Sequence, residues 1–146
     1  LNGENVTSLL RTEETGKMAS KTSKYAAVRT KLVALQRGLA KKTDVIMDGR
    51  DIGTTVLPDA FAKIYLTASS DARAKRRYDE LKEKGENCSF DAIKEDIEKR
   101  DYEDMHRAIS PLKQADDAVL VDTSDMNIEQ VVAALSKIID EKKAGR

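Results

Sequence analysis

The sequence contains very few of the residues on which most metal and nucleophile chemistry depends. It has one cysteine, Cys88, one histidine, His106, and no tryptophan among 146 residues. A single cysteine cannot form an intrachain disulfide, and one cysteine with one histidine cannot complete a conventional zinc site. We therefore expect no metal held by the chain itself and a reducing, cytoplasmic setting.

Long apolar runs and an excess of charge of one sign are also absent. No segment approaches the roughly 20 apolar residues that a membrane-spanning helix needs, and residues 1–5 lack the basic and apolar regions of a signal peptide. Lys plus Arg and Asp plus Glu both number 26, so the formal net charge is zero. Neither a membrane nor a nucleic acid is predicted as a partner, and an anion site would have to be a local cluster of arginines.

Helix signals recur along the chain. Thr12, followed by two acidic residues, predicts a helix start, and Ser23 is expected to cap the next helix. Spacings of four, three and four predict one buried face on that second helix, formed by Val28, Leu32, Leu35 and Leu39. Later helices are expected after Ser69 and Ser89 and from Asn127, the first of them stopping at Gly85. The last one has an apolar stripe of Ile128, Val131, Val132, Leu135, Ile138 and Ile139.

Short apolar segments between these helices predict strands at residues 45–47, 63–66 and 118–121. Strands that alternate with helices indicate an α/β fold, a parallel sheet with helices on both faces. Ligands of such sheets bind beyond the carboxyl ends of the strands. The loops that begin at Asp48, Thr67 and Asp122 are therefore the places to look for a site.

The first of these loops, residues 48–54, is the most informative. Gly49 and Gly53 permit a sharp turn and close approach of a ligand, while Arg50 and Asp51 offer donors and acceptors side by side. An anion that also carries donor groups would suit this turn. A solvated turn with an internal ion pair is the alternative.

A second set of charged residues lies on the helix predicted from Phe90 to Ala108. The apolar stripe that Ile93 and Ile97 begin continues into three charged residues: Arg100, Asp104 and Arg107. Such a face is either a surface ladder of salt bridges or one wall of a cleft. Pro111 is expected to end the helix soon afterwards.

Several motifs in register resemble bacterial cytidylate kinases. They are the turn at 48–54 after the strand at 45–47, then residues 58–60, 63–69, 100–101, 104–108 and 111–112. Residues 1–7, 11–14, 19–20 and 28–29 are similar to the pyrimidine-monophosphate-binding insert of that family. The resemblance implies the P-loop nucleoside monophosphate kinase fold. It divides the chain into part of the insert and a following helix at 1–40, core strands and helix at 41–86, a lid region at 87–113, and a last core strand and helix at 114–146.

The resemblance also implies roles for individual residues. The residues expected to hydrogen-bond the cytosine are Ser20, Arg29 and Asp51. The residues expected to bind phosphate are Arg50 and Arg107, and those expected to meet the ribose are Arg100 and Asp104. Arg77 is the candidate for a lid arginine near the transferred phosphoryl group, although both it and Arg76 could instead lie on an exposed helix face.

The implied reaction converts ATP and CMP, or dCMP, to ADP and CDP, or dCDP, with Mg²⁺ accompanying ATP. Phosphoryl transfer depends mainly on positioning and charge neutralisation, so the shortage of histidine and cysteine does not argue against it. A kinase for another nucleoside monophosphate such as AMP or UMP, and a non-catalytic nucleotide-binding module, remain alternatives.

One departure from the family is serious. The phosphate loop G-x-x-x-x-G-K-[ST] does not occur in the sequence, so nothing equivalent is present to grip the phosphates of ATP. The resemblance therefore implies an N-terminally truncated kinase that retains the acceptor site and the lid and is inactive alone. The strand that leads into this loop in the family would lie between the strands at 45–47 and 62–66. Without it, we expect unpaired strand edges and self-association of the fragment. The full-length parent is expected to be a monomer.

Overall fold

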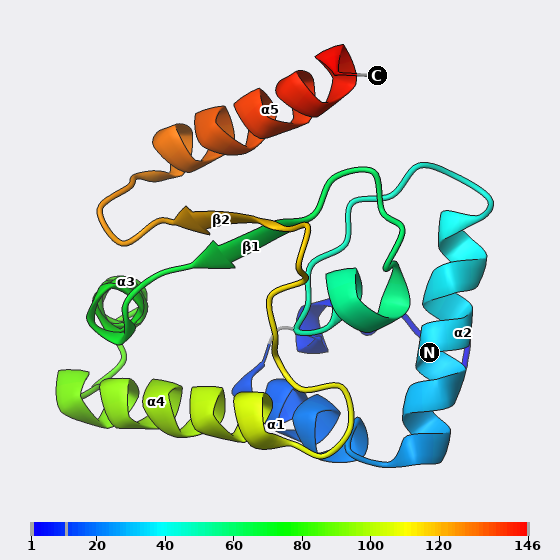
Figure 1. Cartoon of the computed structure of the whole chain (residues 1–146). Helices are drawn as coiled ribbons and strands as arrows, with labels where there is room; N and C mark the ends of the chain where they lie inside the picture. Colours follow the sequence, from blue (N-terminus) through cyan, green and yellow to red (C-terminus); the bar gives the residue numbers. More distant parts are fainter. Residues whose placement is uncertain (1, 11, 146) are drawn as a thin grey trace. The chain divides into compact units, whose positions relative to one another are not determined.

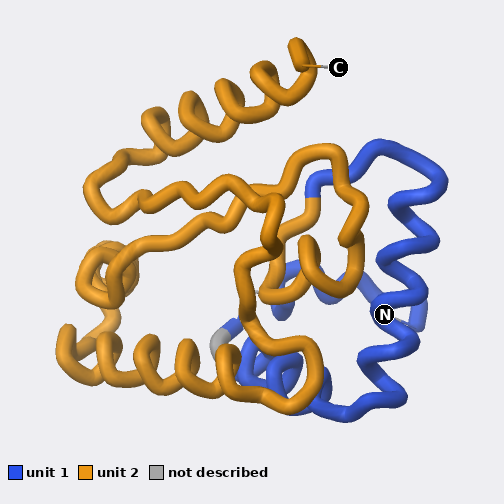
Figure 2. Tube along the Cα trace, in the orientation of Figure 1, with its two compact units in different colours: residues 1–46 blue, residues 47–146 orange. Residues whose placement is uncertain are grey.

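The computed structural model of the chain describes residues 2–10 and 12–145. These residues form two compact units, 1–46 and 47–146, which Figure 2 distinguishes by colour. Leu1 and Arg11, which belong to the motifs of the resemblance, lie outside the described residues. The two units are a coarser division than the four predicted segments, whose boundaries stay predictions.

Unit 1 is helical. It contains the 3₁₀ turn η1 (Thr7–Leu9), helix α1 (Glu13–Thr22) and helix α2 (Ala26–Ala40), labelled in part in Figure 1. The Thr12 hydroxyl accepts a hydrogen bond from the Thr15 N–H at 3.3 Å, which confirms the predicted start of α1. The prediction that Ser23 caps the second helix is wrong. Ser23 ends α1 because its N–H donates to Ala19 O at 3.0 Å, and α2 begins after Tyr25 without a side-chain cap.

The apolar face of α2 was also predicted incorrectly. The spacing of its apolar residues does lie on one helical face, but the residues are exposed, from 40% at Val28 to 57% at Leu39. Periodicity fixes which side chains share a face, whereas burial needs a second apolar layer opposite that face. Among the described residues of unit 1, no second apolar layer covers this face of α2.

Residues 45–47 do not form the predicted strand. Ile46 is fully exposed, at 101%, between half-buried Val45 and Met47, so the segment keeps the alternation of a strand without strand pairing. A strand is defined by the neighbour that takes up its backbone hydrogen bonds. The sheet in the described part of the chain has two strands, and residues 45–47 belong to neither.

Unit 2 contains that sheet. Strands β1 (Ile64–Thr67) and β2 (Val119–Asp122) pair in parallel, in register from Ile64 opposite Val119 to Thr67 opposite Asp122. The predictions for these two strands are confirmed to within one residue. Figure 1 shows helix α5 (Ile128–Ala144) on one side of the strand pair and helices α3 (Ser70–Glu83) and α4 (Phe90–His106) on the other. This arrangement confirms the α/β class.

Polar caps set the starts of these three helices, as predicted. The side chains of Ser69, Ser89 and Asn127 each accept a hydrogen bond from a backbone N–H in the first turn. Asn127 also takes part in a capping box with Gln130, both bonds measuring 2.9 Å. After α3, Gly85 adopts a positive φ of 75°, the conformation that glycine supplies most readily at a helix end.

The apolar core of unit 2 is small. Its buried apolar residues are Val56, Ala68, Ala74 and Val121. Leu66 and Leu120 in the sheet remain more than half exposed, at 53% and 56%. In α5 the predicted stripe divides, because Val131, Leu135, Ile138 and Ile139 are half-buried while Ile128 and Val132 are exposed.

The carboxyl ends of the two strands are joined by polar contacts. The Thr123 hydroxyl donates to Thr67 O at 3.0 Å, and the Ser69 N–H donates to the Ser124 hydroxyl at 2.9 Å. The guanidinium of Arg76 donates to the carbonyl oxygens of Thr123 and Met126. The loops predicted to begin at Thr67 and Asp122 therefore lie together at one edge of the sheet.

Lys63, just before β1, has a largely buried side chain with two oxygen partners. Its side chain is only 9% exposed, and its ammonium donates to Pro58 O and pairs with Asp117 at 2.5 Å. Gly53 lies beside it, and a Cβ there would come within 3.2 Å of Lys63 Cδ. Because Lys63 is tethered at its end, Gly53 cannot be replaced without disturbing this contact. The hydrogen bond from Lys63 lowers the pKa of the Asp117 carboxyl.

The Lys63–Asp117 pair predicts a pH dependence of stability. A carboxyl whose pKa is lowered by folding stabilises the fold above its ordinary pKa of about 3.9, and this contribution is lost as the pH falls through the lower folded value. We expect thermal melts of Asp117→Asn to change less between about pH 6 and about pH 3 than those of the unsubstituted chain. Asp116→Asn is the matched control, because Asp116 makes no ion pair within the described residues. Identical pH dependence for all three proteins would contradict the prediction.

Candidate functional site

The loop at residues 48–54, called here the glycine-bearing turn after Gly49 and Gly53, leads into a single π-helical turn, η2 (Ile52–Val56). Its hydrogen bonds span five residues, from Val56 N to Asp51 O at 3.2 Å and from Leu57 N to Ile52 O at 2.7 Å. Asp51 is 5% exposed and Val56 is 1% exposed. The π-helix is rare and appears mostly as single turns, which occur frequently at functional sites. A Cβ at Gly49 would come 3.0 Å from Ile52 Cγ1, so a larger residue there would require the Ile52 side chain to shift.

Helix α4 ends earlier than predicted. Its last residue is His106, because the Leu112 N–H donates to Asp104 O at 2.8 Å after the chain reverses through Ser110, which has a φ of 50°. Arg107 is therefore extended, with φ −64° and ψ 142°, and its Nε donates to Ser110 O at 2.6 Å. The prediction that Arg107 continues the helical stripe is wrong.

Asp104 connects the turn and the end of α4. Its carboxylate is 10% exposed, accepts a hydrogen bond from Arg50 Nε at 2.9 Å and lies 3.6 Å from the nearer terminal nitrogen of Arg107. Arg50 and Asp104 are 54 residues apart in the chain. We call Arg50, Asp104 and Arg107 the arginine cluster. Three of the residues predicted for the site are thus brought together, and they do not form a ladder along one helix.

The arginine cluster retains unused donors. Nη2 of Arg107 is buried and has no hydrogen-bond partner in the part of the chain that the structure describes. Arg50 is 43% exposed, and within the described residues only its Nε is engaged. A buried donor without a partner destabilises the fold by about 1–3 kcal/mol, and a hydrogen bond to a bound oxyanion would offset this cost. Guanidinium groups match phosphate oxygens in geometry and stay charged, so the cluster is suited to a phosphate group.

The other predicted residues of unit 2 lie apart from these contacts. Arg100 is exposed on α4 and makes no ion pair among the described residues, so the partners of Asp104 are Arg50 and Arg107. Arg77 pairs with Glu80 at 2.9 Å on its own helix, and hydrogen bonds from Lys84 and Arg77 lower the pKa of Glu80. The role proposed for Arg77 stays a prediction.

Ser20 and Arg29 belong to unit 1, on α1 and α2 respectively. The Ser20 carbonyl accepts a hydrogen bond from the Ser23 hydroxyl at 3.0 Å. The roles assigned to these two residues in binding the base also stay predictions.

Two features of the site were not predicted from the sequence. Arg76 ties α3 to the loop after β2, and Ser110 supplies the carbonyl that orients Arg107. The contact of Arg76 joins residues 50 apart, so no local pattern indicates it. Ser110 directly precedes Pro111, and that pair could have signalled a turn.

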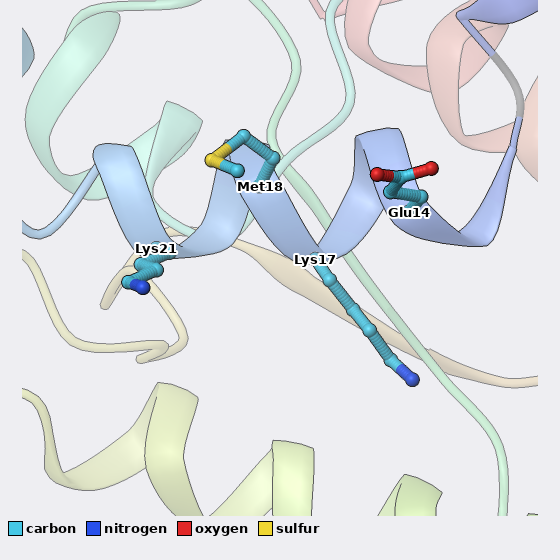
Figure 3. A pocket seen from close by; sticks show the side chains of 4 residues that line it. All are labelled: Glu14, Lys17, Met18 and Lys21. Atoms are coloured by element: carbon cyan, nitrogen blue, oxygen red, sulfur yellow. The ribbon is translucent and has the colours of Figure 1, made fainter.

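A shallow hollow of unit 1 does not form a comparable site. It is lined by Glu14, Lys17, Met18 and Lys21. Figure 3 shows these side chains spreading from successive turns of α1 without converging on one point. Among the described residues, no three Asp, Glu, His or Cys side chains are grouped to hold a metal ion, and no helix there is long and apolar enough to cross a bilayer.

Comparison with known proteins identifies the family. The family model for cytidylate kinase matches residues 1–141. The cytidylate kinase of Lactobacillus johnsonii is 52% identical over 143 residues, which are 98% of this chain and 62% of that protein. The chain belongs to the cytidylate kinase family. The cytidylate kinase of Thermosipho melanesiensis is 47% identical, over 97% of this chain and 65% of its own length.

Membership in the cytidylate kinase family assigns the P-loop nucleoside monophosphate kinase fold, of which the helix-rich structure with its small parallel sheet is a part. The chain spans about six tenths of the length of the curated relatives that it matches, 62% for the Lactobacillus johnsonii protein.

The central role of Asp104 predicts a specific loss of stability. In Asp104→Asn the two guanidinium groups lose their counter-charge and at least one charge-assisted hydrogen bond, so we expect the free energy of unfolding to fall by about 1–3 kcal/mol. Urea denaturation would measure this change. Asp96→Asn, on the exposed side of the same helix, is the control and should have little effect. Equal losses in both variants would show that Asp104 has no special role.

Proposed function

We propose that this chain forms the acceptor side of a nucleoside monophosphate kinase, which as a whole protein converts ATP and CMP, or dCMP, to ADP and CDP, or dCDP. The observation that carries the proposal is the arginine cluster, in which one buried carboxylate holds two guanidinium groups that retain unused donors. Membership in the cytidylate kinase family supports the choice of CMP as the acceptor.

In the proposed reaction, an oxygen of the acceptor phosphate attacks the γ-phosphorus of ATP. An oxygen–phosphorus bond forms, the bond between the γ-phosphorus and the bridging oxygen breaks, and ADP leaves. The protein has to position the phosphates and neutralise their charge, because the reaction needs no protein nucleophile. Arg50 and Arg107 would bind the acceptor phosphate, and Arg77 is the candidate to approach the transferred group.

The remaining site residues would select the nucleoside. Asp104, with Arg100, would meet the ribose, and its carboxylate can accept from a sugar hydroxyl as well as from the two arginines. The residues proposed to read the cytosine are Ser20, Arg29 and Asp51. A carboxylate at position 51 could accept from the exocyclic amino group, and an arginine could donate to the ring acceptors.

The motifs of this sequence do not include one that binds the phosphates of ATP, the phosphoryl donor. No G-x-x-x-x-G-K-[ST] string occurs among its 146 residues, so the backbone amides, lysine and hydroxyl of a phosphate loop are not supplied. Mg²⁺ would arrive with ATP as part of the co-substrate. We therefore propose that the 146-residue chain binds CMP but does not phosphorylate it alone.

Calorimetric titration of the 146-residue chain with CMP, with and without ATP, tests this proposal. CMP should bind, and ATP should leave its affinity unchanged. UMP and AMP in the same experiment test the alternative acceptors, since a kinase for another monophosphate would prefer one of them. Failure to bind CMP, or phosphorylation of CMP by the chain alone, would overturn the proposal.

Replacing Arg107 by lysine tests the phosphate-binding role. Lysine keeps the charge but loses the planar fork, so we expect CMP affinity to fall about tenfold or more while the melting temperature changes little. Arg37→Lys, in α2, is the matched control and should leave CMP affinity unchanged. If both variants bind CMP as the unsubstituted chain does, Arg107 does not bind the phosphate.

A further inference from the structure

Arg73 and Asp101 form a two-pronged ion pair between helices α3 and α4. The two terminal nitrogens of Arg73 donate to the two carboxylate oxygens of Asp101 at 3.0 and 2.6 Å. The side chains are 35% and 23% exposed, so the pair is partly withdrawn from water. A fork of this kind fixes orientation as well as distance, unlike a contact through a single nitrogen.

Arg73 is also bound to the end of the sheet. Its Nε donates to Ala68 O at 3.0 Å, and Ala68 directly follows β1 and is 8% exposed. One side chain thus connects the carboxyl end of β1, helix α3 and helix α4. Since Nε and both terminal nitrogens are engaged, Arg73 has little freedom to change its conformation.

Other contacts between α3 and α4 are less restrictive. Ser70 donates to Glu98 at 2.9 Å and Lys94 pairs with Asp71 at 2.9 Å, each through one donor atom to an exposed carboxylate. Exposed single contacts contribute little, typically about 0–1 kcal/mol for an ion pair. Figure 1 shows α3 nearly end-on while α4 runs across the view, so the two helices are strongly inclined to each other. The Arg73–Asp101 fork is therefore the most constraining polar contact at this crossing.

The position of Asp101 relates the fork to the arginine cluster. Asp101 precedes Asp104 by three residues on α4, slightly less than one helical turn. A rotation of α4 about its axis would therefore move both carboxylates together. The Asp104 carboxylate accepts a hydrogen bond from Arg50 Nε at 2.9 Å. Its backbone carbonyl accepts one from the Leu112 N–H, after the chain reverses direction. Fixing α4 at Asp101 thus sets the direction from which Asp104 meets Arg50 and Arg107.

We propose that Arg73 and Asp101 are positioning residues that hold α4 in the rotation required by the arginine cluster. They contact neither Arg50 nor Arg107 in the structure, and they act through Asp104. The identity of the ligand rests on the proposed function, whereas the positioning role of Arg73 and Asp101 rests only on contacts within unit 2.

Hydrogen exchange on the 146-residue chain tests the positioning without any ligand. We expect Arg73→Ala and Asp101→Asn to speed amide exchange across residues 101–112 about tenfold, while the amides of α5 change little. Arg73→Lys keeps the charge but not the fork, and should give part of this effect if Arg73→Ala does not fold. Lys75→Ala removes an exposed ion pair to Asp79 on the same helix and is the control. Unchanged exchange at 101–112 would overturn the proposal.

CMP titration of the same variants separates positioning from general stability. Below the melting temperature of each variant, we expect Arg73→Ala and Asp101→Asn to bind CMP about tenfold more weakly, and Lys75→Ala to bind normally. The exchanged pair, Arg73→Asp with Asp101→Arg, should recover part of the affinity. Altered exchange with unchanged CMP affinity would overturn the positioning role. If the unsubstituted chain does not bind CMP, the proposed function fails, and the exchange experiment alone decides whether Arg73 holds α4.

Discussion

A buried carboxylate remains charged at low cost only when donors surround it, and Asp104 meets this condition with two arginines from different parts of the chain. Arg50 comes from the glycine-bearing turn and Arg107 from the segment that follows α4. The requirement to satisfy Asp104 therefore brings two loops together in unit 2. Much of the local geometry, including the early end of α4 and the reversal to Leu112, serves this one contact.

The cluster depends in turn on how the helices are attached to the sheet. The side chains of Arg73 and Arg76 extend from α3 and donate hydrogen bonds to backbone carbonyls beyond the ends of the strands. Arg73 donates to Ala68 O, and Arg76 donates to Thr123 O and Met126 O. These contacts partly substitute for a large apolar core, which unit 2 lacks. Guanidinium groups are suited to this function because one side chain can satisfy several oxygens at once.

Most local features of the structure were predictable from the sequence, although the cap predicted at Ser23 is wrong, and features that depend on a distant partner were not predictable. The caps at Thr12, Ser69, Ser89 and Asn127 are set by nearby residues, so the sequence indicates them correctly. The face of α2 and the segment at 45–47 needed a neighbouring layer or strand, which periodicity cannot reveal. Arg50, Asp104 and Arg107 could be selected as site residues through the family resemblance, but the sequence gives no indication that Asp104 holds both arginines.

The left-handed conformation of Ser110 limits which residues evolution can place at that position. Glycine, asparagine and aspartate adopt a φ near 50° most readily, whereas other residues are strained there by roughly 1–2 kcal/mol. The same residue precedes Pro111 and offers its carbonyl to Arg107. Substitution by a β-branched residue would therefore disturb the arginine without touching it. Sequence variation at this one position should consequently be narrow and should favour small or amide side chains.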